Sequence, residues 1–451
     1  MRHSIGMKIS VLRCVTLALM CAASVTAQTV DDTELKQVII FGRHGVRTPN
    51  SPNSVLNNFS AQPFPVFPDV PGNPTDNPPS ILTSNGAANE TLLGGYFRLW
   101  LTQEGLLTGN DSADAANVYF RAQDAPLITD TAQAFASGLL PAASVTIHSV
   151  VPPTNDPLFD PVDAGVALLD EDMVVAASNG RLGSNPQSLT SAYSAELALI
   201  RSVLFNYPVN QSPAPPTPAG KVDVTAIPIS VAAGNSQLPV NLGGLTMVAL
   251  AIDPFVMEYT DGLPASQVAW GQLTADRISQ VFRVYDRLLD LEFRTPYIAT
   301  VQNSNLASHI VRSLVQAATG NAMTGAIASP SAKVIVLTAS NFNIVGLASL
   351  FHLDWLLPGY QADVAAPGGV LMFQLRQSQS TGEYVVRVSY VSQTMDQLRN
   401  RTSLTLNEAP PSAPVAIPGC NNADATLDCP LGRFVRIANE AIDPHSADFV
   451  N

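Results

Sequence analysis

The chain has 451 residues, of which 46% are hydrophobic, and its formal net charge at pH 7 is −13. This length and apolar content exclude a disordered protein and suffice for one large domain with an insertion, or for two domains. The acidic balance argues against a nucleic-acid partner, because a phosphate backbone is bound by a basic surface.

The first 27 residues predict an export signal. Arg2, Lys8 and Arg13 form a basic region before the apolar run Val15 to Ala23, and small residues end the segment at Ala27. The alternative, a membrane anchor, is disfavoured because the apolar run is far shorter than the roughly 20 residues that span a bilayer. We therefore expect a mature chain of residues 28–451, secreted or periplasmic, with a net charge near −16 and no membrane anchor.

The stretch "FGRHGVRTP", residues 41–49, follows a strand-like run at residues 37–40. A neutral imidazole can attack phosphorus, and guanidinium groups match phosphate oxygens in number and geometry. Arg43, His44 and Arg47 therefore predict a phosphoryl-transfer site, with Gly45 allowing a tight turn at the strand end. The alternative is a surface cluster of ion pairs around a structural histidine.

Proline divides the rest of the chain. Residues 49–79 contain nine prolines among Asn, Ser and Asp, which predicts a long surface loop without helix or central strand, next to the Arg-His cluster. Further proline-rich breaks fall at residues 212–221 and 409–414.

Strands and helices alternate between these breaks. Residues 117–123 and 332–340 are β-branched, apolar runs suited to buried strands, whereas residues 273–293 place apolar side chains on one helical face behind a Thr274 cap. This mixture predicts an α/β fold with a mixed central sheet flanked by helices. We assign the core to residues 34–154 and 300–451, and a mainly helical insertion to residues 155–300.

Cys420 and Cys429 are the two cysteines outside the signal. In an exported chain they predict a disulfide that closes a short loop, worth roughly 2–3 kcal/mol in the loop-entropy model. Two free thiols or a metal site are the alternatives, although no neighbouring His or Cys completes a zinc shell.

The longer pattern R-H-G-x-R-x-P after a strand resembles the nucleophile motif of the histidine phosphatase superfamily, branch 2, the histidine acid phosphatases and phytases. The similarity continues through "LTSNGAANETLLGGYFRLWL", "DTAQAFASGLLP", "YTDGLPASQVAWG" and "PGYQADVAAPGGVLMFQL", in family order. The resemblance implies that residues 28–451 form one phosphatase-like domain. It also implies that His44 is phosphorylated and that Arg43 and Arg47 hold the phosphate.

Three further family positions differ in this chain. The resemblance places Leu127 where the family has a third arginine, and Ser340 and Asn341 where it has a histidine and the aspartic acid that protonates the leaving group. Ser340 and Asn341 can hydrogen-bond a bound phosphate, but neither titrates near neutral pH. Candidate substitute acids, from proximity in the family pattern, are Asp124, Asp130 and Asp253. His352 with Asp354 imitates a His-Asp pair, but fits better as a helix-end surface histidine.

The resemblance implies a secreted phosphomonoesterase, impaired by these replacements, that acts on a small-molecule phosphomonoester without a cofactor or metal. A catalytically inactive pseudophosphatase that binds phosphate or another anion is the alternative. A structural or interaction protein with a vestigial pocket is the third.

Overall fold

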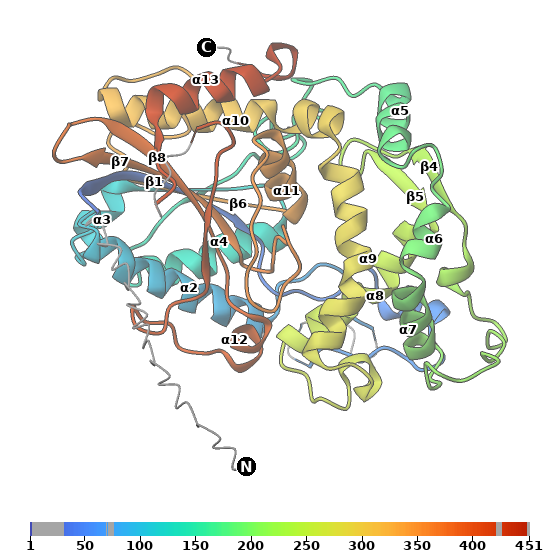
Figure 1. Ribbon diagram of the computed structural model, residues 1–451. Coiled ribbons are helices and arrows are strands. Elements are labelled where there is room, and N and C mark those ends of the chain that lie inside the picture. Colours follow the sequence, from blue (N-terminus) through green and yellow to red (C-terminus); the bar gives the residue numbers. More distant parts are fainter. Residues whose placement is uncertain (2–30, 69, 71–75, 421–425, 449–451) are drawn as a thin grey trace. The chain divides into compact units, whose positions relative to one another are not determined.

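The computed structural model describes residues 1, 31–68, 70, 76–420 and 426–448 (Figure 1). Apart from Met1, the predicted signal at residues 1–27 lies outside the described residues. The compact unit begins at Thr33, and all that follows concerns it. Within the described residues, no helix is both long and apolar enough to cross a membrane.

The centre of the unit is a mixed sheet, as predicted. Strand β1 pairs in parallel with β6 on one side and antiparallel with β7 on the other. The strand order is β10-β8-β7-β1-β6-β2-β3, and β9 also pairs with β8. The strands are β1 (Thr33–Arg43), β2 (Val118–Ala122), β3 (Ile147–His148), β6 (Val334–Ala339), β7 (Val370–Ser378), β8 (Tyr384–Val391), β9 (Ser412–Val415) and β10 (Cys429–Pro430).

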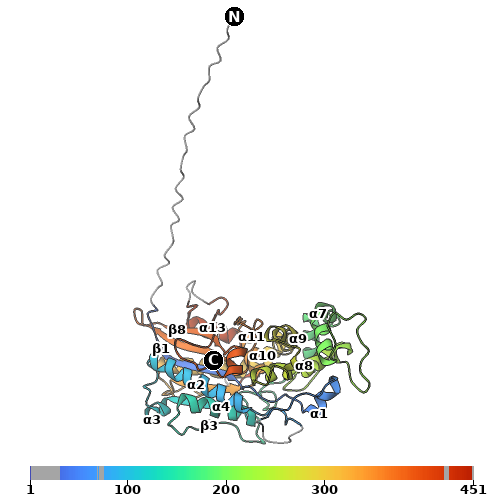
Figure 2. The same ribbon diagram turned by 90° about the horizontal axis from the view of Figure 1, so that it is seen from below.

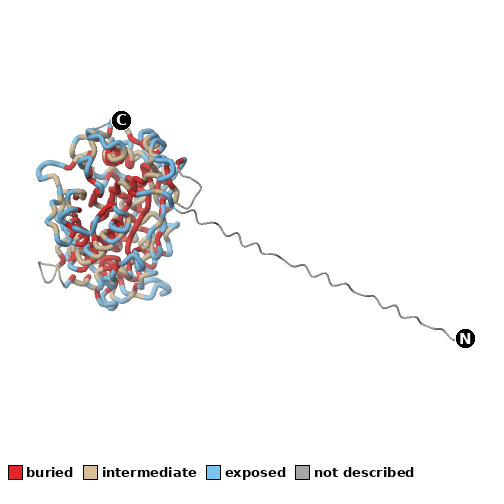
Figure 3. The backbone as a smooth tube through the Cα atoms, turned by 90° about the vertical axis from the view of Figure 1, so that its left-hand side faces the viewer, coloured by how far each residue is buried: buried red, intermediate tan, exposed pale blue. Residues whose placement is uncertain are grey.

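Helices cover both faces of this sheet (Figures 1 and 2). Alternate side chains of β1 face opposite sides, so Val38 and Ile40 pack with one group of helices and Ile39 and Phe41 with the other. The first group is α2 (Ser84–Gln103) and α4 (Pro126–Leu139), and the second is α10 (Pro296–Thr319), α11 (Asn341–Leu350) and α13 (Leu431–Ala441). The central strands β1 and β6 are almost entirely buried, and Figure 3 shows buried residues through the middle of the unit.

The segment between β3 and α10 is mostly helical and has its own hydrophobic cluster. It also contains a two-stranded sheet, β4 (Ile229–Ala233) with β5 (Val240–Gly243). Its α-helices are α5 (Glu171–Arg181), α6 (Ser188–Ala192), α7 (Ser194–Leu204), α8 (Gly244–Thr260) and α9 (Ala275–Phe293). The division of the chain into a core and an insertion at residues 155–300 stays a prediction.

The proline-rich segments depart from expectation in two places. Within residues 49–79, a helical turn forms at α1 (Asn53–Leu56) and η1 (Asn57–Phe59), and Phe59, Phe64 and Phe67 are buried. The prediction of a surface loop without helix was wrong there, because its aromatic side chains pack into the cluster beside α8. Part of residues 409–414 joins the edge strand β9, a position where proline is tolerated.

The helix start predicted at Thr274 is confirmed, but the side-chain cap is not. Helix α9 begins after Thr274, but the Thr274 side chain accepts no hydrogen bond. Its buried face is confirmed, with Ile278, Val281 and Leu288 inside.

Short helical segments complete the described chain: α3 (Asp111–Asp114), η2 (Ala115–Asn117), η3 (Val224–Ala226), η4 (Val268–Gly271), α12 (Met395–Asn400) and η5 (Pro444–Ser446). Cys420 and Cys429 form the predicted disulfide, which ties the loop before β10 to the sheet edge.

Candidate active site

The Arg-His cluster lies where three parallel strands end. Arg43 is the last residue of β1, and the backbone N–H of His44 donates to the carbonyl of Ala339 at the end of β6 (3.0 Å). On the next strand along, the N–H of Gln123 donates to the carbonyl of Thr338 (3.0 Å). Because these strands run in the same direction, His44, Ser340 and Gln123 emerge at one edge of the sheet.

Gly45 is required for close approach and not for an unusual turn. Its φ angle is not positive, so the turn expected at the strand end does not use a left-handed conformation here. A Cβ atom at this position would lie 2.9 Å from Oε1 of Glu90 and 3.1 Å from Cδ1 of Leu82. The Gly45 N–H donates to Oγ1 of Thr131 (3.2 Å), which holds the loop against α4.

The ring of His44 is buried and held in one orientation by a hydrogen bond. Its Nδ1 lies 2.9 Å from the carbonyl oxygen of Gly45, and since a carbonyl can only accept, Nδ1 carries the proton and Nε2 the lone pair. The ring is buried, and burial together with the charges of Arg43 and Arg47 holds the pKa of His44 well below its ordinary value. The imidazole therefore stays neutral in moderately acidic solution.

Arg47 is held rigidly by a carboxylate from the helical segment. Both of its terminal nitrogens donate to Asp253 on α8, at 3.0 and 2.9 Å. The two side chains are only 2% and 3% exposed, and Asp253 also accepts from the N–H of Asn50 (3.1 Å). This bidentate pair fixes the guanidinium plane beside His44.

Arg43 points elsewhere. Its Nη1 donates to the carbonyl of Ala365 (2.7 Å), and its Nε is buried without a hydrogen-bond partner. The side chain lines a small apolar cavity between α9 and the loop that contains Tyr360, whereas His44 and Arg47 line a larger one. Tyr285 and Asp253 border both cavities. Arg43 and Arg47, which were expected to act together, thus line two different cavities.

The larger cavity has a volume of about 640 Å³. It lies between the end of β1, the starts of α4 and α11, and the helices α8 and α9. Its polar or titratable lining residues are His44, Arg47, Asn50, Ser80, Gln237, Thr246, Asp253, Tyr285, Glu292, Ser340 and Asn341. Among the described residues, no group of His, Cys, Asp and Glu has an arrangement that would hold a metal ion.

The three positions at which the sequence was expected to differ from the family all line this cavity. Leu127 belongs to the first turn of α4, and Ser340 and Asn341 stand at the start of α11. Nδ2 of Asn341 is buried without a hydrogen-bond partner in the described chain, while Oγ of Ser340 lies 3.3 Å from Oε1 of Gln123. The N-terminus of a helix attracts anions, so an orphan amide donor at this point favours an anionic ligand.

The substitute acids suggested from the sequence do not fit this geometry. Asp253 lines the cavity but is occupied by Arg47. Asp124 and Asp130 are not among the lining residues, and Asp130 is exposed. His352 follows the end of α11 in an exposed turn, as the surface interpretation expected.

One carboxylic acid in the cavity was missed. Glu292 is 3% exposed near the end of α9 and lines the cavity together with His44. The signal was present in the sequence, because Glu292 lies four residues after Leu288 on the apolar face of the amphipathic helix. A carboxyl group at such a position is rarely buried without a function.

Comparison with known proteins accords with this geometry. Residues 34–204 match the model of the histidine phosphatase superfamily (branch 2). Phytase AppA of Escherichia coli strain K12 is 27% identical over 427 residues, covering 93% of this chain and 95% of the relative. The glucose-1-phosphatase of Salmonella typhimurium strain LT2 is 27% identical, covering 94% and 97%. The solved structure of Hafnia alvei phytase in complex with tartrate is 29% identical, with a TM-score of 0.81 and coverage of 92% and 99%. Over most of its length the chain is therefore similar to proteins of the histidine phosphatase superfamily, branch 2.

Proposed function

We propose that this protein is a phosphomonoesterase of the acid phosphatase type that works through a phosphohistidine at His44. The observation that carries the proposal is the neutral, oriented imidazole beside the fixed guanidinium of Arg47 in a cavity of about 640 Å³. The names of the relatives, a phytase and a glucose-1-phosphatase, support a small phosphate ester as substrate.

Each polar group would have a separate task. Nε2 of His44 attacks phosphorus, and Arg47 offsets the negative charge that repels a nucleophile. Nδ2 of Asn341, which has no partner among the described residues, would donate to a phosphate oxygen at the N-terminus of α11. Arg43 lines the neighbouring cavity and would contribute positive charge to the site from there.

The neutral residues at three positions set the expected rate. A positioned general acid contributes typically 10²–10⁴-fold, and a charged hydrogen bond to phosphate about 1.5–3 kcal/mol. With Leu127 and Asn341 in place of an arginine and an aspartic acid, alkyl phosphates depend on another proton donor. Aryl phosphates, whose leaving groups need less protonation, should react faster.

The alternative is a pseudophosphatase that binds phosphate or another anion without turnover. The replacement of three family positions by residues that do not ionise favours it. In that case Arg47, Asn341 and the start of α11 would hold the anion and His44 would remain unmodified.

The test is turnover of an aryl phosphate between pH 3 and 8, together with calorimetric titration of vanadate. Turnover that His44→Ala abolishes supports the enzyme. Vanadate binding without turnover supports the pseudophosphatase, and neither result supports a structural protein with a vestigial pocket. Turnover that survives His44→Ala in purified protein would exclude the proposed nucleophile.

The protein is also proposed to be exported. The signal-like residues 1–27 and the disulfide between Cys420 and Cys429 support an oxidising compartment. Its acidic net charge supports a small-molecule partner over a nucleic acid.

A further inference from the structure

We propose that Glu292 on α9 is the proton donor of this site, in place of the aspartic acid that the family has at the position of Asn341. The inference rests on the proposed function, because it supplies the acid that an attack by His44 requires. It assigns the step to helix α9, which packs against the start of α11 where Phe293 stacks on Phe342.

The cavity offers few alternatives to Glu292. The titratable or charged side chains that line it are His44, Arg47, Asp253, Tyr285 and Glu292. His44 is the nucleophile, Arg47 and Asp253 neutralise each other, and the phenol of Tyr285 is a weak acid whose pKa burial raises further. Glu292 is the only carboxyl group among these lining residues without an ion pair.

The Glu292 carboxyl group is in the protonation state that an acid catalyst needs. This carboxyl group makes no hydrogen bond or ion pair with the described residues, and the side chain is therefore available to a ligand in the cavity. Burial raises its pKa to about 8. The group is therefore protonated in neutral and acidic solution, where a phosphatase of this type would work.

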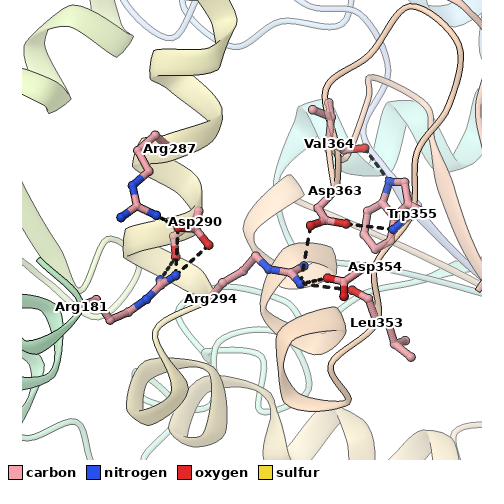
Figure 4. Close-up of polar contacts among 9 residues, drawn as sticks. All are labelled: Arg181, Arg287, Asp290, Arg294, Leu353, Asp354, Trp355, Asp363 and Val364. Atoms are coloured by element: carbon pink, nitrogen blue, oxygen red, sulfur yellow. Dashed lines mark hydrogen bonds and ion pairs between the residues drawn. The ribbon is translucent and has the colours of Figure 1, made fainter. Parts of the chain in front are cut away.

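The residues two positions before and two positions after Glu292 are held by ion pairs, and Figure 4 shows these contacts of Asp290 and Arg294. Asp290 accepts two hydrogen bonds from Arg181 of α5, both at 2.9 Å, and also pairs with Arg287. Arg294 donates to Asp354 (2.5 Å) and to the carbonyl of Leu353 (3.2 Å), beyond the end of α11.

The residues adjacent to Glu292 strengthen this anchoring. Leu291 and Phe293 are 0% and 1% exposed. A side chain between two such anchors has little freedom to leave the cavity, which a catalytic group requires.

Other buried acids lie outside the cavity. Glu90 packs against the far side of the nucleophile loop, where Cβ atoms at Gly45 and Gly368 would meet it. Asp160 accepts from Gln123 and lines a separate cavity. Asp286 lines the small cavity with Arg43. None of the three shares the lining of the His44 cavity.

The reaction balances with Glu292 as acid and then base. Nε2 of His44 forms a bond to phosphorus as the bond from phosphorus to the leaving oxygen breaks, and Glu292 gives that oxygen its proton, which releases the alcohol. The Glu292 carboxylate then takes a proton from water as the water oxygen attacks phosphorus and the N–P bond breaks. Inorganic phosphate leaves, and His44 and Glu292 return to their neutral forms.

The experiment compares Glu292→Gln with the wild type on an alkyl and an aryl phosphate. Turnover of the alkyl phosphate should fall by about 10²–10⁴-fold, and turnover of the aryl phosphate by much less. The wild type should lose kcat/KM as the pH rises through about 8, because the acid form disappears, and this alkaline limb should be absent in Glu292→Gln.

Glu258→Gln is the matched control. Glu258 is also buried on a neighbouring helix, and burial raises its pKa to about 8, but its carboxylate accepts from the N–H of Ala269 (2.8 Å) and does not line the cavity. Its replacement should change neither the alkyl-to-aryl ratio nor the pH profile. Glu292→Leu, which restores the apolar helix face, provides a second variant without the acid, should Glu292→Gln fold poorly.

The outcomes separate the two proposals. An unchanged alkyl-to-aryl ratio in both Glu292 variants, with an active wild type, would overturn the proton-donor role and leave the proposed function intact. A wild type that turns over neither ester and forms no phosphohistidine would overturn the proposed function and this inference with it.

Discussion

Two walls of the same cavity use their polar groups differently. At the end of β1, His44 and Arg47 have each found a partner that fixes them, in Gly45 and Asp253. Beside them, at the starts of α4 and α11, lie Leu127, Ser340 and Asn341, and Nδ2 of Asn341 has no partner among the described residues. The half of the site around His44 and Arg47 is thus organised without a ligand, whereas the other half is neutral and has an unpaired donor.

The largest effect is expected when the imidazole of His44 is removed. His44→Ala should lower aryl phosphate turnover by roughly 10⁴–10⁶-fold, the range typical for loss of a nucleophile. Turnover is measured with purified protein at pH 5. If the variant retained a tenth of the activity, His44 would not be the group on which turnover depends.

Breaking the ion pair between Arg47 and Asp253 tests how much this pair stabilises the folded protein without a ligand. Asp253→Asn leaves the charge of Arg47 buried without a counter-ion, which should lower the free energy of unfolding by about 3–5 kcal/mol. Saturating phosphate should recover part of this loss, because the anion replaces the carboxylate. Urea unfolding with and without phosphate measures both.

The exposed pair Glu34 with Lys36 provides the control for that experiment. Glu34→Gln should change stability by less than about 1 kcal/mol. An equal loss in both variants would mean that burial of the Arg47 pair has no special role.

An arginine at position 127 tests the neutral part of the cavity by adding a positive charge to it. Leu127→Arg should tighten phosphate binding by about 10–100-fold, equivalent to one charged hydrogen bond. It should also lower stability in the absence of phosphate, since a guanidinium replaces a leucine that is 8% exposed. Calorimetry measures the affinity, and Thr129→Arg on the same helix, outside the cavity lining, serves as the control. Equal tightening in both would point to a general charge effect.

A further expected effect is on stability as a function of pH, because Glu292 and His44 titrate in opposite directions. Burial raises the pKa of Glu292, and of Glu90 and Glu258 elsewhere, from 4.5 to about 8. Their contribution to stability is complete below about 4.5 and is lost as the pH rises towards 8. The pKa of His44 is lowered, so its contribution is lost as the pH falls below 6.5.

Three acids outweigh one histidine in this balance. The melting temperature should therefore be several degrees higher at pH 5 than at pH 8, as calorimetric scans would record. Glu258→Gln should flatten the difference. A higher melting temperature at pH 8 would show that these acids are ionised in the folded protein.

Sequence reasoning succeeded where chemistry and periodicity are local. The apolar runs that became β1 and β6 and the amphipathic face of α9 follow from the residues themselves, as does the pairing of two nearby cysteines. The position of the site at the strand ends follows from the motif after β1.

Contacts between distant parts of the chain were not predictable. The direction of Arg43 depends on the carbonyl of Ala365, 322 residues away, and the role of Asp253 on its pairing with Arg47, 206 residues away. The need for glycine at position 45 arises from Glu90 and Leu82 of another segment, and not from the local turn. Glu292 left only a weak trace, an acidic residue on an apolar helix face.

The hydrogen bond between Nδ1 of His44 and the carbonyl of Gly45 has a consequence for how the phosphorylated protein must be handled. Since Nδ1 is blocked by its own loop, the phosphoryl group can attach only at the other ring nitrogen, and a single regioisomer should form. Such a phosphoramidate is stable in alkali and hydrolyses in acid. Precipitation with acid would erase the label, whereas denaturation in base would preserve it as one phosphorus resonance.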